Sequence, residues 1–90
     1  MGPLRALREL KNLYLGGTGI TDRDLEDLLD LPELEVLYVP GNPLITDLGL
    51  ARLQTLRSLR EVNVDETAVT SEGRTLFQAA RPEVKFGHLE

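Results

Sequence analysis

The chain has 90 residues, of which 41% are hydrophobic and 28% charged, and this size and composition indicate a single globular domain. Its formal net charge of −5 argues against nucleic acid or an anionic membrane surface as a partner, because both repel an acidic protein. The absence of cysteine excludes disulfide bonds, thiolate metal sites and a cysteine nucleophile, and it favours an intracellular (cytoplasmic) location over secretion.

The first predicted element is a short strand near the start of the chain. Leu13 and Leu15 alternate with polar or aromatic neighbours, which is the period-2 pattern of a strand with one buried side. Gly16-Gly17 then predicts a turn. Thr21 stands where a helix N-cap belongs, and Asp24 follows at the spacing of a capping box. The predicted helix carries a stripe of apolar residues, Leu25, Leu28 and Leu29.

The same pattern occurs twice more along the chain. An L-x-x-L-x-L motif with aliphatic residues in the same places begins at Leu10, at Leu34 and at Leu59, so the repeat is 24 and then 25 residues long. Thr46 and Thr70 stand at the N-cap place of the two later units, whose helices carry apolar residues in corresponding positions: Leu50, Leu53 and Phe77. No unit can bury its aliphatic side chains alone, so neighbouring units must stack and share one core.

Two places depart from this repeat. The second unit has one extra residue near 43–45, which predicts a small bulge in that loop. Residues 81–86 resemble residues 31–36, which puts Gly87 where Leu37 stood, and we interpret them as a final half-repeat in which Phe86 faces either inward or outward. The predicted organisation is one domain over 1–90, with repeats at about 7–30, 31–55 and 56–80 and a terminal half-repeat at 81–88.

The repeat resembles the leucine-rich-repeat family. Its pattern is similar to L-x-x-L-x-L-x-x-N/C-x-L, with Thr18, Asn42 and Thr67 at the Asn/Cys position. The Ile-Thr-Asp run before a helix is similar to the subclass found in F-box-type and bacterial repeat proteins. The resemblance implies an α/β fold, a right-handed solenoid of about three β-turn-α repeats with a parallel sheet on the concave side and helices on the convex side. It also implies a protein that binds other proteins.

Three features could carry chemistry, and each has a simpler explanation. The glycines of Leu13–Gly19 could cradle a phosphate, but the third glycine of the dinucleotide motif falls on Asp22, and other turn residues fill the same place in the later repeats. An acidic segment could chelate a hard cation, but it lacks the pattern of a calcium loop and reads as a solvated helix face: Asp22, Asp24, Glu26, Asp27 and Asp30. His88 is the only histidine and stands two residues from the end. We predict no catalytic residue, no cofactor and no metal, and therefore no enzyme.

The predicted concave face is the better candidate site. Side chains between the inward aliphatics point outward, so stacking the parallel strands aligns Tyr14, Tyr38 and Asn63 as one row. Tyrosine joins an apolar ring to a hydroxyl and is enriched at binding hot spots. Acidic residues at the far end of the face favour a partner with a basic segment. The predicted partner-binding residues are Asn12, Tyr14, Val36, Tyr38, Glu61, Asn63 and Asp65.

Other interpretations stay open at this point. Cross-strand packing of the two tyrosines could serve only to stabilise the sheet, and this is compatible with binding. The thin cover ahead of Leu7 allows the chain to be the C-terminal end of a longer solenoid, or a homo-oligomer in which the open Leu13–Leu15 strand pairs with a second copy. A regulatory segment attached to an enzyme is a third possibility.

Overall fold

The computed structural model describes residues 9–87, so the expectations about the cover ahead of Leu7 and about His88 fall outside the described residues. Strands and helices alternate along the described chain. Their bounds are β1 (Asn12–Tyr14), α1 (Asp22–Leu28), β2 (Val36–Tyr38), α2 (Asp47–Arg52), the 3₁₀ turn η2 (Leu53–Thr55), β3 (Glu61–Asn63), α3 (Ser71–Ala80) and β4 (Lys85–Phe86).

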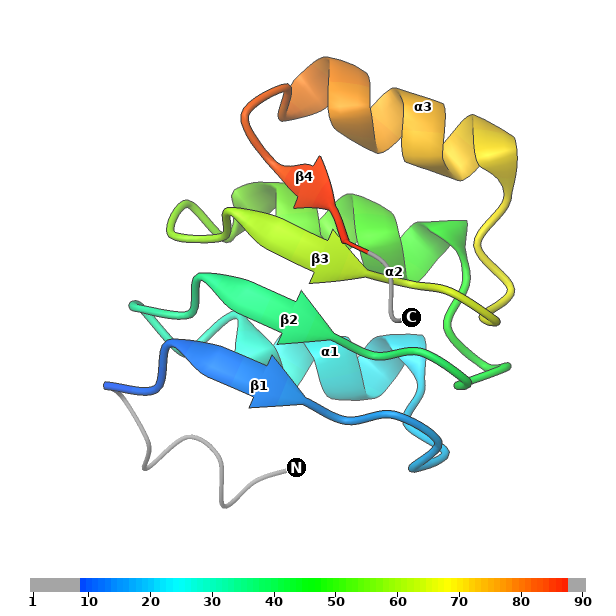
Figure 1. The fold of residues 1–90 in the computed structure, drawn as a ribbon, viewed down its shortest axis with the longest axis horizontal. Helices are drawn as coiled ribbons and strands as arrows, with labels where there is room; N and C mark the ends of the chain where they lie inside the picture. The colour runs from blue at the N-terminus through cyan, green and yellow to red at the C-terminus, as the bar shows by residue number, and fades with distance from the viewer. Residues whose placement is uncertain (1–8, 88–90) are drawn as a thin grey trace.

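The four strands form one parallel sheet in the order β1-β2-β3-β4, and the helices lie on one face of it (Figure 1). The register places Leu13 beside Leu37 and Leu37 beside Val62, so like-placed aliphatics adjoin one another. The predicted α/β class with a parallel sheet is therefore confirmed.

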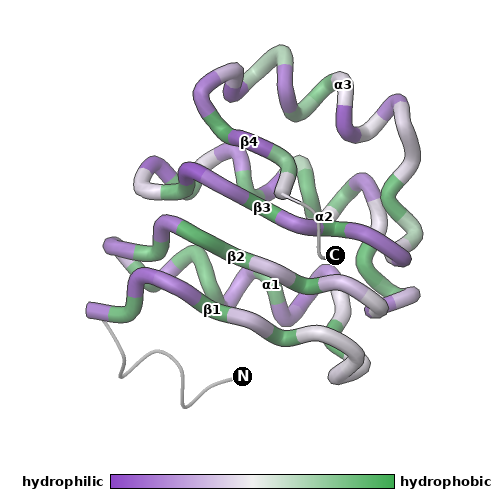
Figure 2. Tube along the Cα trace, viewed as in Figure 1, coloured by the Kyte–Doolittle hydropathy of each residue, from purple (hydrophilic) through white to green (hydrophobic). Residues whose placement is uncertain are grey.

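The core lies between the sheet and the helices. It is built from aliphatic side chains that recur at the same place in successive units, and the strands and helices around it carry both hydrophobic and hydrophilic residues (Figure 2). Leu37 and Val62 are fully buried, whereas Leu13 in the outermost strand β1 is only partly buried, because within residues 9–87 no strand packs beyond it. The middle units therefore have the most complete cover.

Each helix begins at the threonine expected from the sequence. Thr21, Thr46 and Thr70 are extended N-cap residues whose side chains accept hydrogen bonds from amides of the first helical turn. At Thr21 the capping box with Asp24 is complete in both directions. These caps fix where the chain turns from the sheet into each helix.

The turns after β1, β2 and β3 each contain a residue in the left-handed backbone conformation. Gly17 and Gly41 have φ of 62° and 69°, and Glu66, at the same place in the third unit, has φ 56°. Glycine adopts this conformation without strain, while a residue with a Cβ does so at a cost. The glycine of the first unit is therefore explained by the backbone conformation that this turn of the repeat requires.

The buried side chain of Asn42 holds the turns of the first two units together. Its amide nitrogen donates to the carbonyls of Leu15 at 2.8 Å and Val39 at 2.9 Å, and its oxygen accepts from the amides of Thr18 and Gly19 at 3.0 and 2.9 Å. Every polar atom of this fully buried group is thereby satisfied.

The last strand differs from the expected alignment by one residue. Phe86, not Gly87, lies at the place of Leu37, because it pairs with Val62 and its ring meets Phe77 edge-on with 5.8 Å between centroids. At the start of β3 the amides of Arg60 and Glu61 both donate to the Glu35 carbonyl. At the start of β4 only the Lys85 amide donates to the corresponding carbonyl, that of Arg60. One residue is therefore missing before β4, and this turns Phe86 toward the helices.

Arg81 stands where the earlier units have Leu31 and Leu56, as the matching turn hydrogen bonds show. Only 8% of Arg81 is exposed. Its guanidinium donates to carbonyls at the end of η2 and in the turn that follows, including Gln54 at 2.9 Å and Leu56 at 3.0 Å, and also to the Glu83 carboxylate at 2.5 Å. The buried guanidinium thus finds backbone acceptors in the preceding unit, a contact that a leucine at this place cannot make.

Candidate binding surface

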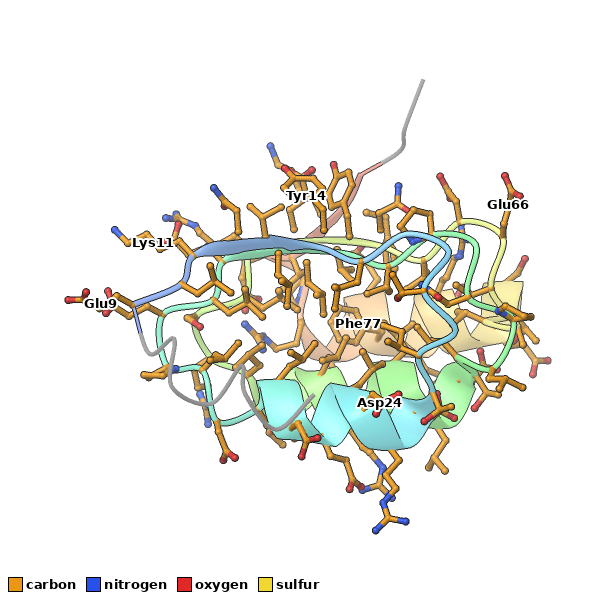
Figure 3. All side chains as sticks on the ribbon, turned by 90° about the horizontal axis from the view of Figure 1, so that it is seen from below. Glu9, Lys11, Tyr14, Asp24, Glu66 and Phe77 are labelled. Carbon is orange, nitrogen blue, oxygen red and sulfur yellow. The ribbon has the colours of Figure 1, made fainter. Side chains whose placement is uncertain are left out.

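The sheet face that points away from the helices is open. Figure 3 shows Tyr14 on this face, with Lys11 at one end and Glu66 at the other, while Phe77 lies on the helix side. The parallel register creates two cross-strand rows: Asn12, Val36, Glu61 and Lys85 form the first, and Tyr14, Tyr38 and Asn63 form the second. Both predicted rows are confirmed, and β4 adds Lys85, which the misplaced alignment of the last strand concealed.

The two tyrosines have different environments, which corrects the expectation that both are available to a partner. Tyr14 is 61% exposed, whereas Tyr38 is only 9% exposed. Their rings are in contact, with 5.1 Å between centroids and 54° between planes. The Tyr38 ring leans along the row toward Gly87. Its hydroxyl donates to the Glu61 carboxylate and occupies the space that a Cβ on Gly87 would need. Tyr14 is thus the exposed ring of the pair, and it rests against the buried ring of Tyr38.

Bonding to Glu61 also affects the acidity of Tyr38. The hydrogen bond to the Glu61 carboxylate, burial of the ring and the negative charge of Glu61 together raise the pKa of Tyr38 from 10.0 to about 12. The hydroxyl therefore stays protonated and holds the carboxylate in place over the physiological range.

Asn63 is the second correction, because it is fully buried and cannot face a partner. Its side-chain oxygen accepts from the Asp65 amide at 2.9 Å, and its amide nitrogen lies 3.3 Å from the Asp65 carboxylate. This local ring shapes the turn after β3. Asp65 in turn lies 3.7 Å from Arg74 of α3, so its charge is partly balanced.

The exposed part of the face is consequently narrower than expected. It consists of the exposed Asn12, Tyr14 and Lys85 with the half-buried Val36 and Glu61, while Asp65 lies at its margin. Tyr14 and Val36 contribute apolar surface, and Glu61 and Lys85 contribute one charge of each sign. Such a surface combines a hydrophobic contact with polar groups that fix orientation.

The two ends of the face differ in charge. The carboxyl ends of the strands lead to Asp65 and Glu66. A shallow hollow of about 480 Å³ at the amino ends is lined by three cations and three carboxylates, namely Lys11, Arg57, Arg60, Glu33, Glu35 and Glu83, together with Pro32, Ser58 and Leu59. The charges at the amino ends of the strands therefore balance, whereas the carboxyl ends carry net negative charge.

The loop amides that could have held a phosphate are used within the chain. The Gly17 amide donates to the Pro40 carbonyl at 2.9 Å, and the next two amides donate to Asn42. The glycines thus bring the loop close to its neighbour and leave those amides no free hydrogen for an anion.

The acidic helix segment is likewise engaged in protein contacts. Asp22 accepts from Thr46, Asp24 accepts from Thr21, and Glu26 pairs with Arg52. Over residues 9–87 no group of three or more His, Cys, Asp or Glu side chains is arranged to hold a metal ion. None of the helices in the same range has the length and apolar character needed to cross a bilayer.

The chain matches no family model, and no curated protein and no solved structure is significantly similar to it.

Proposed function

We propose that the chain is a short leucine-rich-repeat solenoid that acts by binding another protein, inside the cell, rather than by catalysis. Support for the fold comes from the repeat of 24 and 25 residues and from the parallel register that stacks like-placed aliphatics. Each unit depends on its neighbours for burial, as in repeat proteins generally.

The single observation that supports binding is the exposure of Tyr14. A tyrosine that is 61% exposed, whose ring rests on a buried second tyrosine, presents a rigid apolar surface with little conformational entropy left to lose. Val36 in the neighbouring row extends this surface. We propose that the surface formed by Tyr14 and Val36 is the anchor of the interface. A basic segment of the partner would then lie over Glu61 and over the end of the face that carries Asp65.

Binding to an isolated partner would test this proposal through two matched substitutions. Tyr14→Ala removes the exposed ring and should weaken affinity at least tenfold, which corresponds to about 1.4 kcal/mol. Leu76→Ala removes a side chain that is 69% exposed on α3, away from the sheet, and should leave affinity unchanged. Equal affinity for wild type and Tyr14→Ala would remove this face from consideration.

A second candidate is self-association through β1. Leu10, Leu13 and Leu15 are partly buried, while their counterparts Leu34, Leu37 and Val39 are fully buried. Within residues 9–87 no strand pairs with the outer edge of β1, and such an edge with incompletely covered leucines can pair with the same edge of another copy. Light scattering over a range of concentrations distinguishes this from binding to a different protein, since edge pairing predicts a mass that rises to two chains and stops there.

A further inference from the structure

The strands all begin at the same side of the molecule, because the sheet is parallel (Figure 1). The segments that lead into them therefore form one edge, and Lys11 lies at this edge while Glu66 lies at the opposite end (Figure 3). The shallow hollow of about 480 Å³ lies in the same edge. We call the residues that line it the amino edge: Lys11, Pro32, Glu33, Glu35, Arg57, Ser58, Leu59, Arg60 and Glu83.

Charge at the amino edge changes sign from one unit to the next. The second unit contributes Glu33 and Glu35, and the third contributes Arg57 and Arg60. A pair of negative charges thus stands beside a pair of positive ones. The boundary between the two pairs lies between β2 and β3, in the middle of the sheet.

Glu35 and Arg60 hold the same place in the repeat. The Glu35 amide donates to the Lys11 carbonyl at 2.8 Å, and the Arg60 amide donates to the Glu35 carbonyl at 2.7 Å. Lys11, Glu35 and Arg60 therefore follow one another across the strands at the same height of the edge. The two residues on either side of the boundary are matched in position and opposite in sign.

Most of these charges have no partner of opposite sign inside the chain. Within residues 9–87, Glu83 is the only charged residue of the amino edge in an ion pair, and its partner is Arg81. Glu33, Arg57 and Arg60 are exposed, and Glu35 is half-buried. These side chains can therefore be approached by opposite charges from another molecule.

We propose that the amino edge is a two-fold interface between two copies of this chain. An axis perpendicular to the sheet, between β2 and β3, reverses the order of the units, so the second unit of one copy meets the third unit of the other. Glu35 then faces Arg60 of the second copy at the same height, and the symmetry repeats this contact. The carboxylate of Glu33 likewise meets the third unit of the second copy, which carries Arg57.

The outer units agree with this arrangement. Reversal brings Lys11 of the first unit toward Glu83 of the last unit of the second copy, and these charges are also opposite; Glu9 does not line the hollow. An arrangement that kept the order of the units would place like charges together, which repel. The proposed axis leaves both open sheet faces on the same side, so the inference goes beyond the proposed function and does not depend on it.

The wild-type chain provides the first test. Single exposed ion pairs are weak, so light scattering is measured up to high protein concentration, in about 0.01 M and in about 1 M salt. The mass should rise toward two chains in low salt and return to one chain in high salt, because salt screens exposed charges. A mass that does not rise in low salt would overturn the proposal. A rise that is equal in both salts would also overturn it, and would indicate pairing through the leucines of β1.

Charge reversal on separate chains gives the sharper test. One variant carries Glu33→Arg with Glu35→Arg, and the other carries Arg57→Glu with Arg60→Glu. Alone, each variant should associate with itself at least about tenfold more weakly than the wild type, since like charges then meet across the axis. An equimolar mixture should recover association as a complex of one chain of each kind, because opposite charges meet at both halves of the interface. A mixture that stays monomeric would contradict the two-fold contact.

A matched control separates this edge from overall charge. Glu66→Arg with Glu72→Arg changes the net charge by the same amount as the reversal of the two glutamates, but both residues are exposed and away from the amino edge. This variant should associate like the wild type, and a loss of association here would overturn the proposal. Circular dichroism checks the folding of every variant. If a reversal variant is unfolded, Glu33→Gln with Glu35→Gln replaces it and should also weaken association, whereas wild-type association in that variant would count against the interface.

Discussion

The Tyr38 hydroxyl on β2 donates a hydrogen bond to the Glu61 carboxylate on β3. This contact ties two neighbouring strands together on the open face of the sheet. It also determines the position of the Tyr38 ring on which Tyr14 rests. The exposed anchor of the proposed interface therefore depends on a bond made by its buried neighbour.

The acidity of Tyr38 gives a direct measure of this bond. The chain has two tyrosines, so Tyr14→Phe leaves Tyr38 as the only one, and its ionisation can be followed by tyrosinate absorbance. Because the hydrogen bond to Glu61 is the largest cause of the raised pKa of Tyr38, we expect a transition near pH 12 that moves toward pH 10 when Glu61→Gln is added. A transition near pH 10 before that change would contradict the bond.

The same shift predicts how stability depends on pH. Since the folded pKa of Tyr38 lies above the value of an unfolded tyrosine, the folded state favours the protonated hydroxyl. Its contribution is fully present below pH 10 and is lost as the pH rises from 10 to about 12. Urea denaturation across this range should show a steeper loss of stability for the wild type than for Tyr38→Phe.

Asn42 is expected to be the most sensitive polar residue. Asn42→Leu would leave the amides of Thr18 and Gly19 and the carbonyl of Val39 without the partner that Asn42 provides, and buried groups of this kind cost about 1–3 kcal/mol each. Asn42→Thr should be milder, because the hydroxyls of Thr18 and Thr67 bond the corresponding carbonyls of their own turns. Chemical denaturation of the two variants should separate them clearly, and equal losses would contradict the role of the amide.

Much of the fold could be predicted from the repeat because each unit repeats the same physical requirement. Aliphatics at a period of two specify the strand, a threonine begins each helix, and the register follows from stacking like-placed residues such as Leu37 and Val62. The last strand was placed wrongly because sequence similarity between 81–86 and 31–36 does not reveal that one backbone residue is missing before Lys85.

The exposure of the candidate site was harder to predict. Alternation correctly assigned Tyr38 and Asn63 to the open face but could not show that the Tyr38 ring leans along the row toward Gly87. Gly87 was the available signal, since a residue without a side chain beside a tyrosine leaves room for the ring. Arg81 was missed for a related reason, because nothing local distinguishes a buried arginine that bonds carbonyls from an exposed one.

Glu66 should be a site where a substitution stabilises the protein. A non-glycine residue at positive φ costs about 1–2 kcal/mol, and the entropy lost by glycine on folding offsets about 0.5–1 kcal/mol of that gain. Glu66→Gly should therefore raise the free energy of unfolding by up to about 1 kcal/mol. Glu66→Ala serves as the control and should give no such gain, because alanine keeps the Cβ. A loss of stability in Glu66→Gly would contradict the strain.

Position within the stack should decide the cost of removing a core leucine. Leu37 is fully buried with a unit on either side, so Leu37→Ala should cost about 2–5 kcal/mol. Leu13 has the same place in the first unit but is only partly buried, so Leu13→Ala should cost less. A larger loss for Leu13 in urea denaturation would mean that the first unit has more cover than residues 9–87 provide.

The contact between Asp22 and Gly49 allows a test in which one substitution changes sign. Gly49→Ala should destabilise the wild type, because the new Cβ overlaps the Asp22 carboxylate and lies 3.0 Å from a methyl of Leu25, and overpacking costs about 1–3 kcal/mol. In an Asp22→Ala background the carboxylate is gone and only the flexible end of Leu25 has to move. There Gly49→Ala should stabilise the protein by up to about 1 kcal/mol, because alanine is the better helix former. Denaturation of the four variants gives the coupling between the two positions. If Gly49→Ala had the same effect in both backgrounds, the glycine would not be there to admit the carboxylate, and the contact between successive helices would have to be explained in another way.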